Sequence, residues 1–311
     1  MHNGHPGDTT AAAGIATRLV NMRNIAVILG LICGVLAAPV FATPIVYSGG
    51  HADIRANWNP ATNPNLFTVV LRADAGAIMN GTPLSAAADY AGNAFVFQVP
   101  ASANLGRIQN TTAFWGGNTS PPNNGYNFST STYDYTGAAV GDSLWVLSSN
   151  QVDTIHYGTP WIGFGAEPAG VTGWSSQIFF RLTSFAFDGS AYGATGGQFS
   201  ASTPSGSRRW DTADGSFAND SYSVGPGSHT HPRFYFTEPG TYTVGITVTG
   251  THTTHGAVSG TEVFTFQVVP EPGACGLAML GIGGAAAGLL RRRISQKHLV
   301  SRDVHGLEPV A

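Results

Sequence analysis

Two short polar motifs combine residue types and a spacing that suit metal binding. His229 and His231 are separated by one residue, and so are His51 and Asp53. On a β-strand, residues i and i+2 point to the same face, so each pair would present two donor atoms side by side. Imidazole nitrogens and carboxylate oxygens are ligands of Zn²⁺ and similar divalent ions. The competing interpretation is two exposed histidines at a strand entrance, with Asp53 capping a turn.

Aromatic residues offer a second kind of site. Trp161, Phe164, Trp174 and Trp210 could form a platform for a sugar ring. They could equally be core residues, because each aromatic ring buries a large apolar area. A platform would make the chain a carbohydrate-binding module that holds exopolysaccharide, which is our alternative function.

Two further polar motifs favour ordinary surface structure. The carboxylates of Asp211 and Asp214 could bind calcium, but without the remaining oxygen ligands a turn at Asp214-Gly215 explains them as well. His252 and His255 lie in a Gly- and Thr-rich stretch between two expected strands, which indicates a solvated loop.

The sequence offers little for catalysis. It has no Gly-x-Ser-x-Gly elbow, no His-Glu-x-x-His helix and no phosphate-binding loop. We therefore predict that the protein is not an enzyme. A glycoside-type hydrolase is the third alternative, because its two carboxylates can be far apart in sequence.

The elements that would position these residues are β-strands. Apolar residues alternate with polar ones, or form short β-branched and aromatic runs, between turns such as Asn80-Gly81 and Pro239-Gly240. This pattern predicts an all-β fold, specifically an antiparallel β-sandwich that is Ig- or PKD-like in its C-terminal third. A short helix is expected only within 73–91, and 116–137 is expected to be a long exposed loop or a hinge. The expected strands are 66–71, 94–99, 143–147, 178–187, 241–249 and 264–268.

The predicted ectodomain spans 43–269, with candidate subregions 43–115 and 138–269 joined by the polar loop. It contains no lysine, seven arginines and thirteen acidic residues, which gives a net charge of −6. This charge argues against nucleic acid as a partner, because phosphate binding needs clustered Lys and Arg. Cys33 and Cys275 both lie outside this range, so the ectodomain has neither a disulfide nor a Cys-ligated metal.

The C-terminus has three consecutive parts typical of a sorting signal. An uncharged run of membrane-spanning length predicts a transmembrane helix at 273–290, and the basic residues after it predict its cytoplasmic end. Residues 294–311 would then be a short cytoplasmic tail. The parts, within 270–293, are Pro270-Glu271-Pro272, the run 273–290 and Arg291-Arg292-Arg293. In this order they resemble the PEP-CTERM signal, in which a membrane protease, an exosortase, processes the protein at the Pro-Glu-Pro element.

The N-terminus has the pattern of a secretory signal peptide within residues 1–42, which implies an N-terminal signal helix. Arg23 precedes an apolar run at 25–36, and small residues lead to a cleavage site between Ala42 and Thr43. A permanent membrane anchor is the competing interpretation. The chain could start at Met1 or at Met22, because Met22-Arg23-Asn24 would make a compact n-region. Signal peptidase and an exosortase are therefore the expected processing partners.

Four segments of the ectodomain together resemble the choice-of-anchor M family of surface proteins. That family carries one kind of ectodomain on different C-terminal anchors, PEP-CTERM among them, and implies no established biochemical activity. In this chain Pro232-Arg233 displaces the aromatic residue that usually follows the second histidine of the third segment. The segments are 47–54, 158–164, 228–236 and 237–244.

Because 47–54 and 228–236 both match motifs of the family, the resemblance pairs His51 and Asp53 with His229 and His231 as one candidate metal site. The sequence thus predicts an exported surface or matrix protein, non-catalytic, with a divalent metal such as zinc as its candidate cofactor. It would be anchored transiently in the membrane and then lie at the cell surface or outside the cell. Exopolysaccharide or the cell envelope is its expected partner.

Overall fold

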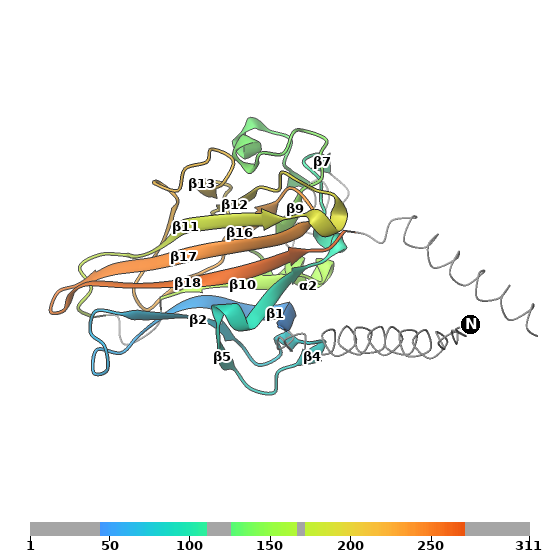
Figure 1. The fold of residues 1–311 in the computed structure, drawn as a ribbon. Helices are drawn as coiled ribbons and strands as arrows, with labels where there is room; N and C mark the ends of the chain where they lie inside the picture. The colour runs from blue at the N-terminus through green and yellow to red at the C-terminus, as the bar shows by residue number, and fades with distance from the viewer. Residues whose placement is uncertain (1–43, 111–125, 167–171, 271–311) are drawn as a thin grey trace, which may run out of the picture. The chain divides into compact units, whose positions relative to one another are not determined.

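The computed structural model describes residues 44–110, 126–166 and 172–270 (Figure 1). The predicted signal peptide, its cleavage site at Ala42 and Thr43, and the sorting signal from Glu271 onward lie outside them. Within them, no helix combines the length and the apolar character needed to cross a membrane.

The described residues are mainly β-strand, which confirms the all-β class. One α-helix, α2 (Gln151–Tyr157), occurs among them. The 3₁₀ helices are η1 (Gly92–Ala94), η2 (Ala101–Ala103), η3 (Ser131–Thr136) and η4 (Ser190–Tyr192). The strands are β1 (Ile45–Trp58), β2 (Phe67–Ala73), β3 (Ile78–Met79), β4 (Thr82–Pro83), β5 (Ala88–Ala91), β6 (Phe95–Val99), β7 (Gln109–Asn110), β8 (Tyr126–Asn127), β9 (Trp145–Leu147), β10 (Pro160–Gly165), β11 (Ile178–Asp188), β12 (Phe199–Ser202), β13 (Arg208–Asp211), β14 (Ser221–Val224), β15 (His229–Thr230), β16 (Arg233–Phe236), β17 (Gly240–His252) and β18 (Gly256–Val268).

Strands from both predicted subregions, 43–115 and 138–269, share the larger sheet. Its twelve strands within the described ranges follow the order β14-β11-β17-β18-β6-β1-β10-β15, with β2 and β3 also paired to β1, β5 to β2, and β4 to β3. A second sheet has the order β13-β12-β16-β9, and β7 pairs with β8. The predicted antiparallel arrangement does not hold for every strand pair, because β1 runs parallel to both β6 and β10, and β6 runs parallel to β18.

The main core lies between the four-stranded sheet and strands β17 and β18. Phe199 of β12 packs on Phe266 of β18 at a ring-centroid distance of 5.6 Å, and Phe236 of β16 packs on Tyr242 of β17 at 5.1 Å. All four side chains are buried. Burial of aromatic rings of this size is a major apolar contribution to a domain in which the sequence places no disulfide.

A smaller core corrects the expectation of an exposed loop or hinge at 116–137. In the described part of that range, Phe128 is only 1% exposed and packs edge-on against Tyr235 of β16. The buried guanidinium of Arg107 donates hydrogen bonds to the carbonyl oxygens of Phe128 and Ala138 and pairs with Asp134. Residues 126–138 are thus held onto the β-sheet unit by an aromatic contact and a buried cation.

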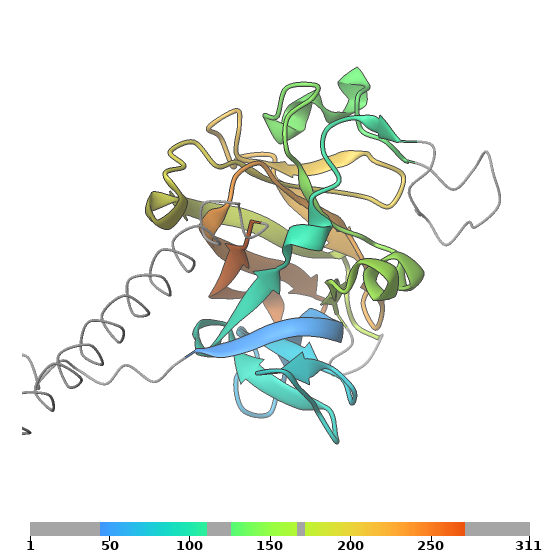
Figure 2. The ribbon, with the colours of Figure 1, turned by 90° about the vertical axis from the view of Figure 1, so that its right-hand side faces the viewer.

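Strand β1 changes its pairing partners at Gly49 and Gly50. Before this point β1 pairs with β6 and β3, and after it β1 pairs with β10 and β2. Gly50 has a φ of +84°, a conformation that residues other than glycine rarely adopt. His51 is the first residue after the change. Figure 2 shows β1, in blue, between the cyan strands and the rest of the β-sheet unit.

The helix α2 contacts β1 and β10 next to this point. The side chain of Asn150 caps it by accepting a hydrogen bond from the Val152 amide, and Gly158 ends it in the left-handed conformation. The short helix expected within 73–91 is absent from the described structure, in which β3, β4 and β5 occupy that range. The Asn80-Gly81 turn joins β3 to β4, and both of its residues have positive φ.

Candidate metal centre

The parallel pairing of β1 with β10 brings the two predicted polar motifs together. His51 lies opposite Trp161, and Asp53 lies opposite Gly163. The next strand across β10 is β15, in which His229 lies opposite Gly165. Strand β10 thus lies between β1, which carries His51 and Asp53, and β15, which carries His229. His231 follows directly after β15.

Three histidines converge at this place. His51, His229 and His231 each offer one ring nitrogen, and these nitrogens lie within 4.8 Å of one another. The ring centroids are 5.0 Å apart for His51 and His231, 6.0 Å for His51 and His229, and 5.5 Å for His229 and His231. Nitrogens at such separations could share one ion with modest side-chain rotation, because zinc–nitrogen bonds are about 2 Å long.

The Asp74 carboxylate orients His51. Its Oδ2 lies 2.6 Å from Nδ1 of His51, and the Asp74 amide donates to the His51 carbonyl oxygen. This contact occupies Nδ1 and leaves Nε2 of His51 directed to the cluster, 3.6 Å from Oδ1 of Asp53. A carboxylate behind a ligating imidazole is the usual arrangement at metal sites, where it fixes the tautomer and raises the basicity of the ligand.

Several buried polar atoms at the centre lack hydrogen-bond partners. They are Nε2 of His51, Oδ1 of Asp53 and both ring nitrogens of His231. Leaving a buried polar group without a partner costs about 1–3 kcal/mol, so several in one place are unusual in a folded protein. A bound cation would satisfy Nε2 of His51, Oδ1 of Asp53 and one ring nitrogen of His231 together, and this is the strongest indication that the residues fit a metal ion.

Trp161 and Gly163 of β10 shape the cluster. The Trp161 ring stacks on His231 at a centroid distance of 4.0 Å, and its indole N–H donates to the Ser149 carbonyl oxygen. At Gly163, a β-carbon would overlap Oδ1 of Asp53 and lie 2.9 Å from Cε1 of His231. A glycine is therefore required here if Asp53 and His231 are to lie side by side.

His51 and His231, both half-buried, have opposite pKa shifts. Burial lowers the pKa of His51, but the neighbouring carboxylates of Asp53 and Asp74 outweigh this effect and raise it to about 9. Burial lowers the pKa of His231 to about 4, against the opposing charge of Asp53. His231 is thus neutral at pH 7, the form in which imidazole binds metals. A metal ion at His51 would have to displace a proton.

The donor set restricts the choice of ion. Three imidazoles and one carboxylate suit Zn²⁺ or a neighbouring transition metal rather than Ca²⁺ or Mg²⁺, which prefer all-oxygen ligands. His229 is exposed, whereas Asp53 and its surroundings are buried. The centre is therefore open to solvent on the His229 side.

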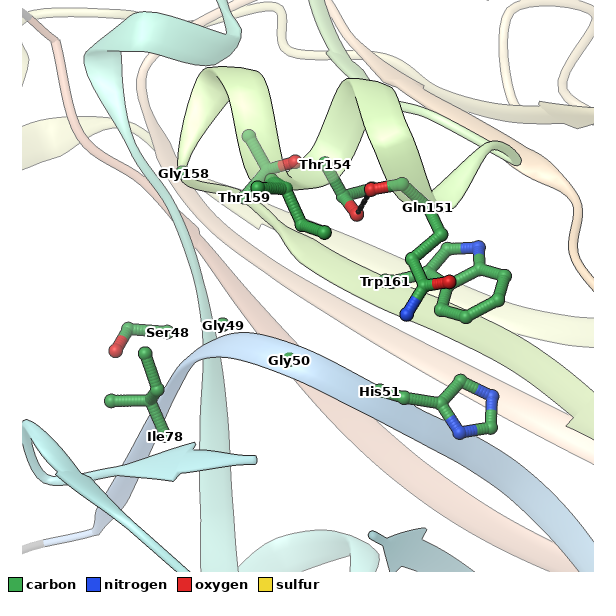
Figure 3. Close-up of a pocket in the computed structure, with 11 residues that line it drawn as sticks. Ser48, Gly49, Gly50, His51, Ile78, Gln151, Thr154, Gly158, Thr159 and Trp161 are labelled. Atoms are coloured by element: carbon green, nitrogen blue, oxygen red, sulfur yellow. Dashed lines mark hydrogen bonds between the residues drawn. The ribbon is translucent and has the colours of Figure 1, made fainter. Parts of the chain in front are cut away.

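A cleft of about 280 Å³ adjoins the centre between β1, α2 and β10 (Figure 3). His51 and Trp161 form one end of it, and Ile78 lies at the other end. Gln151 of α2 points from above toward Trp161 and His51 (Figure 3). The cleft and the histidine cluster therefore share His51, and Trp161 borders both.

The structure overturns the prediction of a joint aromatic platform. Phe164 and Trp210 are fully buried and pack on each other at 5.0 Å. Trp174 stacks on Phe67 at 5.5 Å, whereas Trp161 stacks on His231 at 4.0 Å. The four rings thus take part in three separate packing contacts, and because Phe164 and Trp210 are core residues, the four do not form one joint platform.

The remaining polar motifs are structural. Arg208 pairs with Asp211 at 3.1 Å and with Asp214 at 3.2 Å, so a guanidinium takes the place that calcium would need. His252 and His255 are not simply solvated, because both are half-buried and their rings lie 4.7 and 5.5 Å from that of Trp58.

The residues that sequence reasoning missed at the centre are Asp74, Trp161 and Gly163. Trp161 and Gly163 lie in one of the four segments that carry the family resemblance, which was a usable signal. Asp74 had no such signal, because only the pairing of β1 with β2 brings it to His51. Comparison of the chain with protein-family models, curated proteins and solved structures found no match.

Proposed function

We propose that this protein is a non-catalytic surface or extracellular-matrix protein that holds one divalent transition-metal ion, with zinc the best fit. The observation that carries the proposal is the convergence of His51, His229 and His231, whose ligating nitrogens lie within 4.8 Å of one another. Asp53 is the fourth ligand in this proposal, and Asp74 orients His51 from behind. The donor set and the unpartnered buried atoms support it.

The distribution of the site over the chain adds support. Of the four segments that resemble the choice-of-anchor M family, 47–54 supplies His51 and Asp53, 158–164 supplies Trp161 and Gly163, and 228–236 supplies His229 and His231. Segments that are distant in sequence thus meet at one place. A shared metal centre would explain why such short motifs occur together in one ectodomain.

The fourth segment, 237–244, supports the proposal of an Ig- or PKD-like C-terminal third. Its Tyr242 hydroxyl donates to the Glu238 carbonyl oxygen at 2.6 Å and accepts from the Glu238 amide at 3.0 Å. A tyrosine that bonds back to the backbone a few residues upstream is a hallmark of Ig-type sandwiches. This likeness concerns the fold and carries no function.

Export and sorting complete the proposal and depend on sequence alone. The signal peptide before Thr43, the Pro270-Glu271-Pro272 element and the basic residues Arg291, Arg292 and Arg293 favour processing by signal peptidase and an exosortase. The protein would then act at the cell surface or in an exopolysaccharide matrix. The alternative of a carbohydrate-binding module has lost its aromatic platform, which leaves the metal centre as the better-supported function.

Elemental analysis of the purified full chain tests the metal proposal. We expect one equivalent of zinc or a similar ion in the wild type and its loss in the His229→Ala/His231→Ala variant, because two of the three imidazoles are then gone. The chain contains ten histidines, so the matched control is His252→Ala/His255→Ala, which removes a histidine pair elsewhere. Equal metal content in the wild type and the His229→Ala/His231→Ala variant would refute the proposal.

A further inference from the structure

The last described residues mark the end of the β-sheet unit from which the predicted membrane anchor begins. Val268 ends β18 opposite Val99 of β6, and the Val269 amide donates to the Val99 carbonyl oxygen at 2.9 Å. Pro270 follows and is the last residue that the structure describes. The uncharged run that is predicted to span the membrane starts at Gly273, three residues further along the chain.

Chain length limits how far this end can lie from a bilayer. Three residues of fully extended chain reach about 10 Å. The run 273–290 has eighteen residues. As a helix it would measure about 27 Å, and all of it would be needed to cross a hydrocarbon core of about 30 Å. None of the run is left over as a spacer, so this end of the unit must lie close to the membrane surface while the anchor is intact.

The helix α2 lies at the same end and exposes apolar side chains. The short helix η2 follows β6, and its Ser102 hydroxyl donates to the Tyr157 carbonyl oxygen of α2 at 2.6 Å. Figure 1 shows α2 and the C-terminal end of β18 at one end of the β-sheet unit. On α2, Val152 is 50% exposed and Ile155 is 73% exposed. Being three residues apart, they share one face of the helix.

The helix η4 adds an exposed aromatic residue at this end. Asp188, Thr241 and Gln267 lie opposite one another across β11, β17 and β18, next to the end of β18, and η4 follows β11 after one residue. Tyr192 of η4 is 41% exposed. Tyrosine suits the headgroup region of a bilayer, because its ring is apolar and its hydroxyl can stay hydrated. Single exposed apolar residues are ordinary, but these three occupy the end from which the anchor begins.

We propose that this end of the unit rests on the non-cytoplasmic surface of the lipid bilayer while the anchor is intact. Val152 and Ile155 of α2 and the ring of Tyr192 then lie in the interface between headgroups and acyl chains. This proposal rests on the proposed export and sorting, since the anchor holds the unit at the membrane. So few apolar contacts would bind a bilayer only weakly from solution, but the anchor makes the contact intramolecular.

The test attaches the fluorescent probe NBD to single cysteines of the full chain, reconstituted in vesicles of phosphatidylcholine. The two natural cysteines, Cys33 and Cys275, are first replaced by serine. The probe is attached at Ile155→Cys or, as a matched control, at Leu66→Cys. Leu66 is also exposed, at 46%, but it pairs with Ser259, about 30 Å before the end of β18.

Lipids brominated in their acyl chains should quench the probe at Ile155→Cys at least about threefold more strongly than at Leu66→Cys, because quenching requires contact with the bilayer. Phosphatidylcholine is the lipid of choice, since the predicted ectodomain has a net charge of −6 and anionic lipid would repel it. Flotation of the vesicles shows in the same samples whether the chain is anchored.

Two double variants separate apolar contact from proximity alone, with the probe at Tyr192→Cys in both. Val152→Asp/Ile155→Asp should reduce quenching about threefold or more, because charged side chains do not enter the interface with the acyl chains. Leu66→Asp/Val263→Asp makes the same change at two exposed apolar residues away from this end, and should leave quenching unchanged.

The outcomes separate this inference from the proposed function. If the chain does not float with the vesicles, the proposed sorting anchor and the lipid contact both fail. If it floats but Ile155→Cys is quenched no more than Leu66→Cys, only the lipid contact fails. The same holds if Val152→Asp/Ile155→Asp leaves quenching unchanged. A blue shift of the probe at Ile155→Cys in native membranes but not in pure lipid would assign this surface to a protein partner and refute the lipid contact.

Discussion

At the scale of single residues, the lack of a side chain at Gly163 leaves room for Asp53 and His231 to lie next to each other. The backbone of Gly163 is extended in β10, so alanine would be acceptable there in conformation but not in volume. Its neighbour Gly165 differs, because a β-carbon there would meet Asp53 and Arg55 no closer than 3.4 Å, an ordinary contact. The two glycines thus form a matched pair for mutation.

We expect Gly163→Ala to lower metal affinity about tenfold or more, because Asp53 or His231 must move to admit the methyl group. Gly165→Ala should retain the affinity of the wild type. Competition with a chromophoric chelator measures both values, and circular dichroism checks that both variants fold. Equal affinities in the two variants would show that Asp53 and His231 do not act together at the metal.

Sequence reasoning reached the four residues of the centre but not their arrangement. His51 and Asp53 could be recognised as a pair, like His229 and His231, because residues two positions apart on a strand point to the same face. What brings the pairs together is the register of β10 between β1 and β15, which links residues more than one hundred positions apart. Such pairing depends on the whole fold, so Asp74 and Gly163 could not be derived locally.

At the scale of elements, the change of partners in β1 places His51. Gly50 combines positive φ with close packing, since a β-carbon there would lie 2.7 Å from Cα of Ala77. Gly81, in the β3–β4 turn, also has positive φ, but a β-carbon there would meet no atom within 4 Å. Comparison of the two residues separates backbone strain from steric overlap.

We expect Gly81→Ala to cost about 1 kcal/mol of unfolding free energy, from backbone strain alone. Gly50→Ala should cost about 2–4 kcal/mol, because the overlap with Ala77 adds to the strain. Urea denaturation followed by tryptophan fluorescence gives both values. If the two variants lose the same stability, β1 does not need close packing at this point.

The alternation of apolar and polar residues predicted where the strands lie much better than whether neighbouring strands run parallel or antiparallel. The ranges 178–187 and 94–99 agree closely with β11 and β6, because period-two burial is a local property. Parallel pairing of β1 with β6 and β10 leaves no local mark, since it depends on long connections. The helix α2 was missed although Asn150 and Gly158 bracket it, because seven residues are too few to show helical periodicity.

At the scale of the whole molecule, a buried carboxyl couples stability to pH. Asp220 is 1% exposed, accepts a hydrogen bond from the Asp211 amide, and has Arg208 3.8 Å from its other oxygen. Burial raises its pKa from 3.8 to about 6; the Asp211 amide and Arg208 oppose the shift, and the charges of Asp214 and Asp211 add to it. The folded protein therefore holds this proton more tightly than the unfolded chain does.

This shift gives a direction for the pH dependence. Below pH 3.8 the carboxyl is protonated in both states, and above about pH 6 it is ionised in both. As pH rises between these values, the folded state loses stability relative to the unfolded state, by up to about 3 kcal/mol.

Asp220→Asn removes the titration but keeps an oxygen for the Asp211 amide. Between pH 4 and pH 7, the unfolding free energy of this variant should therefore rise relative to that of the wild type by up to about 3 kcal/mol. Denaturation of both proteins in chelator across this range measures the difference. Asp214→Asn, a half-exposed partner of the same Arg208, should show little of it, and a difference between Asp220→Asn and wild type that stays constant with pH would contradict the assignment.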